Sequence, residues 1–127
     1  MAKAEGLSLP FYGPETIRAD MLEPIDYHGN EQTITLEYPE FSAVCPYSGL
    51  PDIARITIEY IPNKKIIELK SLKYYFISYR NVGIYQEDMT DRVYNDLKKS
   101  LNPKKLRVTT LYNVRGGIET RCVMGSI

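Results

Sequence analysis

The chain has 127 residues, about the size of one ordinary domain and too few for separate cofactor and substrate domains. Lysine plus arginine and aspartate plus glutamate balance at 16 each, so no net field concentrates polyanions, and nucleic acid is not expected as a direct partner. No apolar run approaches the roughly 20 residues that cross a bilayer, and the start lacks a signal-peptide pattern. Two cysteines without a CxxC motif favour a reduced, cytoplasmic setting.

The N-terminal quarter differs in composition from the rest of the chain. Residues 1–30 are rich in proline and glycine, which predicts an irregular arm, with a single domain over residues 31–127. Alternating polar and apolar residues over 33–38 predict a half-buried strand, and the same period returns over 56–61.

Two helices are expected in the middle of the chain. Apolar residues at steps of three and four predict a helix over residues 71–80 with one apolar face. A second helix is expected to begin at Glu87 and Asp88, whose acids suit a first helical turn, and to end near Leu101, where lysines precede an Asn-Pro pair.

The C-terminal part returns to the period of a strand. Residues 106–112 and 118–123 both alternate, and the paired glycines between them predict a hairpin. The order of strands, two helices and strands is typical of an α+β fold, with an antiparallel sheet and the helices packed on one face.

One turn combines a thiol with a carboxylate. Two prolines and a glycine within residues 46–51 predict a rigid turn that presents Cys45 and Asp52 at its two ends. The pair suits covalent catalysis, in which a thiolate attacks an electrophilic carbon such as that of a nitrile while a carboxyl group handles the proton. A buried structural cysteine beside a turn-forming aspartate is the alternative that these residues leave open.

The first predicted helix carries a basic stripe. Lys70 and Lys73 lie one turn apart, Arg80 returns to nearly the same face, and Ser71 is nearby. Such a stripe can grip phosphate, although the solvated face of an amphipathic helix has the same pattern. The sequence has no GxGxxG motif or P-loop, so any dinucleotide must be bound without them.

The second predicted helix begins with Gln86 and Glu87. An amide beside a carboxylate can read the donor edge of a guanine-like base, although acids in a first turn also complement the helix dipole. Cys122 is in phase with its strand, and His28 lies in an expected loop, so neither is assigned chemistry. A single histidine argues against a catalytic zinc site, and no metal is expected.

Together these segments resemble the NADPH-dependent 7-cyano-7-deazaguanine reductases, the nitrile reductases of queuosine biosynthesis, in their short single-domain form. The resemblance covers roughly residues 31–123. It rests on Cys45 with Asp52 seven positions later, on the segment ELKSLKYY over residues 68–75, which matches the family's signature at every position, and on Glu87 after the turn at 80–83.

The resemblance implies a fold, an assembly and a reaction. The fold would be the tunnelling fold, a four-stranded antiparallel sheet with two helices on one face, whose subunits form homo-oligomeric barrels and stacked rings with sites between subunits. Cys45 would add to the nitrile carbon of 7-cyano-7-deazaguanine to form a thioimide, and Asp52 would supply the proton to nitrogen. Two NADPH would then complete the reduction to 7-aminomethyl-7-deazaguanine.

The resemblance also implies which residues bind the two ligands. The expected substrate-binding residues are Ile67, Glu68, Leu69, Gln86 and Glu87. The expected NADPH-binding residues are Lys70, Ser71, Lys73 and Arg80. Gln86 stands where many members of the family have histidine, and since glutamine does not titrate near neutrality, a proton-relay role is disfavoured at this position.

Three other functions are compatible with parts of this pattern. An archaeal-type amidinotransferase, which adds ammonia to the nitrile within tRNA, shares the cysteine and aspartate but lacks the helix signature; the intact segment 68–75 and the neutral charge favour reduction. A GTP cyclohydrolase-like activity would need zinc ligands that one histidine hardly supplies. A non-catalytic ring protein that binds purines or pterins would bind the nitrile without an adduct.

Overall fold

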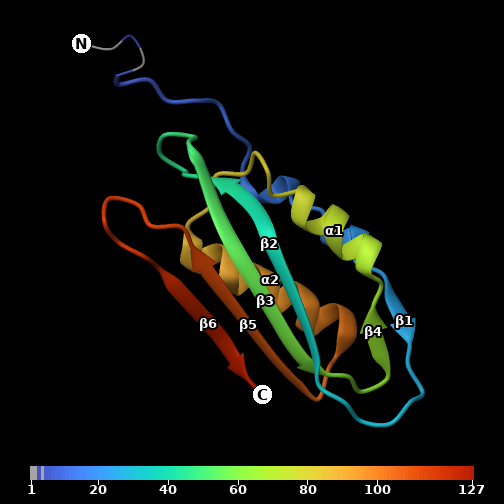
Figure 1. Cartoon of the computed structure of the whole chain (residues 1–127). Helices are drawn as coiled ribbons and strands as arrows, with labels where there is room; N and C mark the ends of the chain where they lie inside the picture. Colours follow the sequence, from blue (N-terminus) through green and yellow to red (C-terminus); the bar gives the residue numbers. More distant parts are fainter. Residues whose placement is uncertain (1–2, 4) are drawn as a thin grey trace.

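A four-stranded antiparallel sheet with two helices on one of its faces forms the body of the molecule (Figure 1). The structure is a computed structural model that describes residue 3 and residues 5–127. The sheet order is β2-β3-β5-β6, with strands β2 (Ile34–Val44), β3 (Pro51–Ile61), β5 (Lys105–Tyr112) and β6 (Arg121–Ser126). The helices are α1 (Leu69–Ile77) and α2 (Gln86–Leu101). The predicted α+β class and sheet arrangement are confirmed.

The core lies between the helices and one face of the sheet. Alternate residues of β3 are buried, from Asp52 to Tyr60, because side chains along a strand point to opposite faces. The aromatic rings of Tyr38 on β2 and Phe76 on α1 stack with centroids 4.7 Å apart, which fixes α1 against the edge of the sheet. On the other side, α2 packs against β5 and β6.

The bounds predicted for the first helix are wrong at both ends. The helix begins earlier because both carboxylate oxygens of Glu68 accept hydrogen bonds from its first turn, from the backbone N–H of Lys70 at 2.7 Å and of Ser71 at 2.8 Å. It ends at Ile77, and the backbone then tightens into a turn. Arg80 lies in that turn, so the prediction that it continues the basic stripe of the helix is also wrong.

The second helix and the C-terminal hairpin agree more closely with the predictions. Helix α2 begins one residue before the expected acids and ends at Leu101, where Asn102 adopts a left-handed conformation with φ of 44°. β5 and β6 pair antiparallel, and the positive φ angles of Gly116 and Gly117 confirm the predicted hairpin.

The N-terminal arm is more regular than its composition predicts. It contains two short 3-10 helices, Pro14–Thr16 and Ala19–Met21, and the strand β1 (Pro24–Asp26). β1 pairs antiparallel with β4 (Lys65–Ile67), the short strand that leads into α1. Within the described part of the chain, no helix combines the length and apolar character that crossing a bilayer requires.

Candidate active site

Cys45 stands at the start of the tight turn that joins β2 to β3. Its backbone N–H donates to the carbonyl of Leu50 at 2.8 Å, and its own carbonyl accepts from the N–H of Gly49 at 2.9 Å. Gly49 has φ of +73°, and a Cβ there would collide with the carbonyl oxygen of Leu9. The predicted rigid turn is therefore present, and it holds a half-buried free thiol.

Asp52 lies across the same turn, at the start of β3. Asp52 pairs with Ala43 in the β2–β3 ladder, so the side chains of these two residues point to the same face of the sheet. Cys45 follows Ala43 by two residues, which places it at the same end of this hairpin. Asp52 is only 5% exposed, an unusual state for a carboxylate without a dedicated function.

Arg115 reaches this site from the connection between β5 and β6. Its guanidinium forms an ion pair with Oδ1 of Asp52. That oxygen nevertheless accepts no hydrogen bond of ordinary geometry from the described residues. The only signal in the sequence was an arginine directly before two glycines, and nothing local connects it with a carboxylate more than sixty residues earlier.

The surroundings of Cys45 favour its reactive form. The backbone N–H of Ser48 lowers the pKa of the thiol most strongly, and burial opposes this effect. The N–H of Tyr47, the hydroxyl of Ser48 and the charge of Arg115 lower the pKa further. Because the thiolate is the nucleophile, this turn increases the fraction of Cys45 in its reactive form.

The start of α2 is brought to the same end of the sheet. The N–H of Val44 donates to the carbonyl of Val82 at 3.0 Å, and the N–H of Ile84 donates to the carbonyl of Val44 at 3.2 Å. This bridge ties the residue before Cys45 to the segment that leads into Gln86 and Glu87. In the first turn of α2, Gln86 is half-buried and Glu87 is exposed to solvent.

The start of α1, with Ile67, Glu68 and Leu69, lies at the opposite end of the subunit, whereas Arg80 precedes the segment that is bonded to Val44. The N–H of Ile67, directly before Glu68, donates to the phenol oxygen of Tyr60 at 3.2 Å. Tyr60 follows Asp52 by eight residues on the same strand, a distance of about 26 Å at the usual rise of a β-strand. One subunit therefore does not bring Glu68 and the start of α1 to Cys45.

Ser71, one of the expected NADPH contacts, is engaged within the subunit. The residue is 7% exposed. Its hydroxyl donates to the carbonyl of Glu68 at 2.7 Å and accepts from the N–H of Glu23 at 3.0 Å. The hydroxyl thus fastens the arm to the start of α1, whereas Lys70 and Lys73 of the same helix are exposed.

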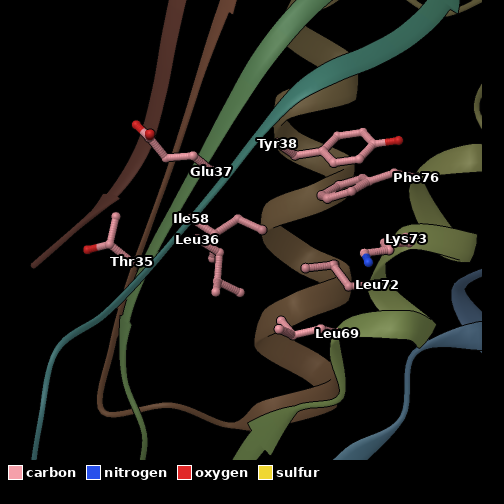
Figure 2. Close-up of a pocket in the computed structure, with 9 residues that line it drawn as sticks. All are labelled: Thr35, Leu36, Glu37, Tyr38, Ile58, Leu69, Leu72, Lys73 and Phe76. Atoms are coloured by element: carbon pink, nitrogen blue, oxygen red, sulfur yellow. The ribbon is translucent and has the colours of Figure 1, made fainter.

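A hollow of about 240 Å³ lies between α1 and the edge strand β2 (Figure 2). Leu69, Leu72 and Phe76 of the helix face Leu36 and Ile58 of the sheet across it. The complete lining is Thr35, Leu36, Glu37, Tyr38, Ile58, Leu69, Leu72, Lys73 and Phe76. Two expected ligand contacts, Leu69 and Lys73, therefore border a largely apolar groove beside an outer strand.

Comparison with known proteins gives consistent matches. The model of the family described as QueF-like protein matches residues 51–127. The chain is 59% identical to the NADPH-dependent 7-cyano-7-deazaguanine reductases of Thermotoga petrophila and Thermotoga maritima, over 100% of this chain and 93% of each relative. It is 52% identical to the reductase of the same name from Caldicellulosiruptor bescii, over 88% of this chain and 87% of that protein.

A solved structure has the same fold. The crystal structure of the archaeosine synthase QueF-Like in the apo form superimposes with a TM-score of 0.67 and covers 79% of this chain and 96% of that chain. The two sequences are 24% identical. At that level the likeness supports the tunnelling-type fold and says nothing of the reaction.

Proposed function

Since this chain belongs to the QueF-like protein family, we propose that it is an NADPH-dependent reductase that converts the nitrile of 7-cyano-7-deazaguanine into the aminomethyl group of 7-aminomethyl-7-deazaguanine, a step of queuosine biosynthesis. Relatives that match it over its whole length are oxidoreductases of this name. The observation that carries the mechanism is the position of Cys45, a thiol with a lowered pKa, at the same end of one hairpin as the buried Asp52.

The first step uses these two residues. The thiolate of Cys45 attacks the nitrile carbon, a carbon–sulfur bond forms, and the electron pair displaced from the triple bond takes a proton from Asp52 on nitrogen. The product is a thioimide on Cys45. This order of events requires Asp52 to be protonated before attack.

The thioimide is then reduced in two stages. NADPH supplies one hydride to carbon in each stage. After the first hydride the carbon–sulfur bond breaks, Cys45 leaves as a thiolate and an imine remains; the second hydride and a proton on nitrogen give the amine. Cys45 is thereby regenerated, and two hydrides and two protons account for the added hydrogens.

Recognition of the two ligands is divided between the helices. Glu87, at the positive end of α2, has the acceptor oxygens that the ring N–H and exocyclic amine of a guanine-like base require, and Gln86 can add an amide. The exposed cations of Lys70, Lys73 and Arg80 suit the phosphates of NADPH. The Ser71 hydroxyl would have to exchange a hydrogen bond of the fold to take part.

We further propose that the complete site forms between subunits of a homo-oligomer in the cytoplasm. Asp52 and Tyr60 lie about 26 Å apart along β3, and Tyr60 contacts Ile67 directly before the start of α1, which supports this arrangement. Ile67, Glu68 and Leu69 would then reach the substrate of a neighbouring copy. Two free cysteines suit a reducing compartment.

The test separates attack from reduction. Mixing the protein with 7-cyano-7-deazaguanine without NADPH should give a mass increase on Cys45 equal to the mass of the substrate, because addition to a nitrile releases nothing. NADPH added afterwards should be oxidised, two per substrate, while the adduct disappears. Mass spectrometry and the absorbance of NADPH follow the two events.

Two variants act as controls. Cys45→Ala should abolish both the adduct and NADPH oxidation, while Asp52→Ala should keep substrate binding and lose turnover. An adduct without NADPH oxidation would favour transfer chemistry of the amidinotransferase kind, and binding without an adduct would favour a non-catalytic module. Substantial reduction by Cys45→Ala would refute the covalent mechanism.

A further inference from the structure

A buried phenol beside the site lacks the hydrogen bond that its burial calls for. Tyr112, at the end of β5, is 2% exposed, and its Oη has no hydrogen-bond partner among the described residues. Buried polar groups are nearly always paired, so an unpaired one calls for an explanation. The other buried side-chain oxygen in this state is Oδ1 of Asp52, in the same region of the sheet.

The sheet register places Tyr112 next to the catalytic hairpin. Tyr112 pairs with Ala54 of β3, so their side chains point to the same face of the sheet. Ala54 follows Asp52 by two residues on that strand, and residues two apart share a face. Tyr112 and Asp52 therefore lie on the face of the sheet that the helices cover, on adjacent strands and offset by two residues in the register.

Packing of α2 places Glu87 above the same phenol. The hydroxyls of Thr90 and Thr110 are 2.6 Å apart and fix α2 to β5 at one point. A connection of only three residues joins α2 to β5, and the two elements run in opposite directions (Figure 1). Tyr112 follows Thr110 by two residues on β5, and Glu87 precedes Thr90 by about one turn on α2. Because the two elements run in opposite directions, Tyr112 and Glu87 lie at the same end of this contact.

The phenol is a donor, and its surroundings narrow the choice of acceptor. Burial raises the pKa of Tyr112, and its neighbours Cys122, Tyr79 and Glu87 raise it further, so the O–H keeps its proton. The phenol oxygen of Tyr79, 2.7 Å from that of Tyr75, is a neutral acceptor, and the thiol of Cys122 is a weak one. The carboxylate of Glu87 is the strongest acceptor among these three neighbours.

We propose that Tyr112 is a positioning residue, whose O–H donates a hydrogen bond to Glu87 when substrate is bound and holds that carboxylate toward the guanine-like base. In the free subunit Glu87 is exposed and Tyr112 is unpaired. Binding of the base draws the carboxylate inward, and the hydrogen bond forms at that moment. This inference rests on the proposed function, in which Glu87 reads the base.

A double-mutant cycle tests the pairing. Binding of 7-cyano-7-deazaguanine is measured by calorimetry in the Cys45→Ala protein, so that no adduct forms. Tyr112→Phe should raise Kd about tenfold or more, the loss expected for one hydrogen bond to a charged group. In the Glu87→Ala background the same change should raise Kd less than about threefold, because the acceptor has already gone.

Tyr79→Phe is the matched control, because that phenol is also buried but already has its partner. It should lower the midpoint of thermal unfolding and leave Kd unchanged, whereas Tyr112→Phe should leave the midpoint unchanged or raise it. An unchanged Kd in Tyr112→Phe, or an equal loss with and without the Glu87 carboxylate, would overturn the inference. A failure of the proposed function has a different signature, since the unaltered chain would then not oxidise NADPH with this nitrile.

Discussion

Cys45 has a lowered pKa mainly because the N–H of Ser48 stabilises its thiolate, and the charge of Arg115 adds to this effect. We therefore expect iodoacetamide to alkylate Cys45 with a pH midpoint below the value of about 8.5 for a free thiol. The midpoint moves to lower pH because the thiolate is the form that reacts, and a thiol with a lower pKa has a larger thiolate fraction at any given pH. The rate of alkylation, measured by stopped flow from about pH 5 to about pH 10, gives the midpoint.

Two variants make this measurement specific. Cys122→Ser leaves Cys45 as the sole cysteine of the chain. Arg115→Ala in that background should raise the midpoint slightly, because Arg115 is the smallest of the contributions that lower the pKa. A midpoint at or above that of a free thiol would contradict the role assigned to the turn.

At the level of residues, the sequence predicts site residues that lie close together in the chain, but not those brought together by strand pairing. Cys45 and Asp52 are seven positions apart and were predicted together, because one turn holds them both. Arg115 and Tyr112 escaped notice because they approach Asp52 only through the pairing of β3 with β5, which joins distant parts of the chain. A buried tyrosine in an alternating strand also has the pattern of an ordinary core residue.

Among the elements, the start of α1 combines a helix cap with a proposed substrate contact, and both involve Glu68. Glu68 caps the helix through both carboxylate oxygens, and each oxygen keeps a second lone pair for the substrate contact that we propose. Glu68→Asp should preserve the cap, since aspartate is a preferred N-cap residue, and should change the free energy of unfolding by less than about 0.5 kcal/mol. It should raise KM for the nitrile several-fold, because the shorter side chain withdraws the carboxylate.

Glu68→Ala is the comparison for this prediction. It removes the cap as well and should lower the free energy of unfolding by about 1 kcal/mol, as denaturant titration measures. If Glu68→Asp leaves KM unchanged, the carboxylate is a cap only, and its assignment to the substrate is wrong.

The sequence predicted the main elements and the end of α2 at Leu101, but not the bounds of α1. The strand and helix periods were readable because one face of each element is buried. The bounds of α1 depend on the Glu68 cap and on a closing turn, which are hydrogen-bonding details that periodicity does not report. The short pair β1–β4 joins the arm to a distant segment, and three residues are too few to show a period.

For the whole molecule, the outer strands of the sheet offer the edges at which subunits could be joined. β2 and β6 each have a strand neighbour on one side only, and an outer strand leaves a row of backbone N–H and C=O groups available for pairing. Half-buried side chains such as Leu36 and Tyr38 line the groove beside β2. In the proposed homo-oligomer, edge-to-edge pairing of subunits would cover these groups.

A shared site makes a prediction that a site within one subunit does not make. Cys45→Ala and the double variant Lys70→Ala/Lys73→Ala should each be inactive alone, since one lacks the nucleophile and the other the phosphate contacts. When the two chains are co-expressed with different tags and mixed oligomers are purified, some interfaces combine an intact hairpin with an intact α1. Random mixing should restore roughly a quarter of the activity per site, because each half is intact in half of the subunits.

NADPH oxidation by the doubly tagged fraction measures this recovery, and oligomers mixed from Cys45→Ala and Asp52→Ala chains are the control. These two changes fall in the same hairpin, so no interface regains both residues and no recovery is expected. Recovery in this control would show that Cys45 and Asp52 act from different subunits, whereas no recovery in the first mixture would place the whole site within one subunit.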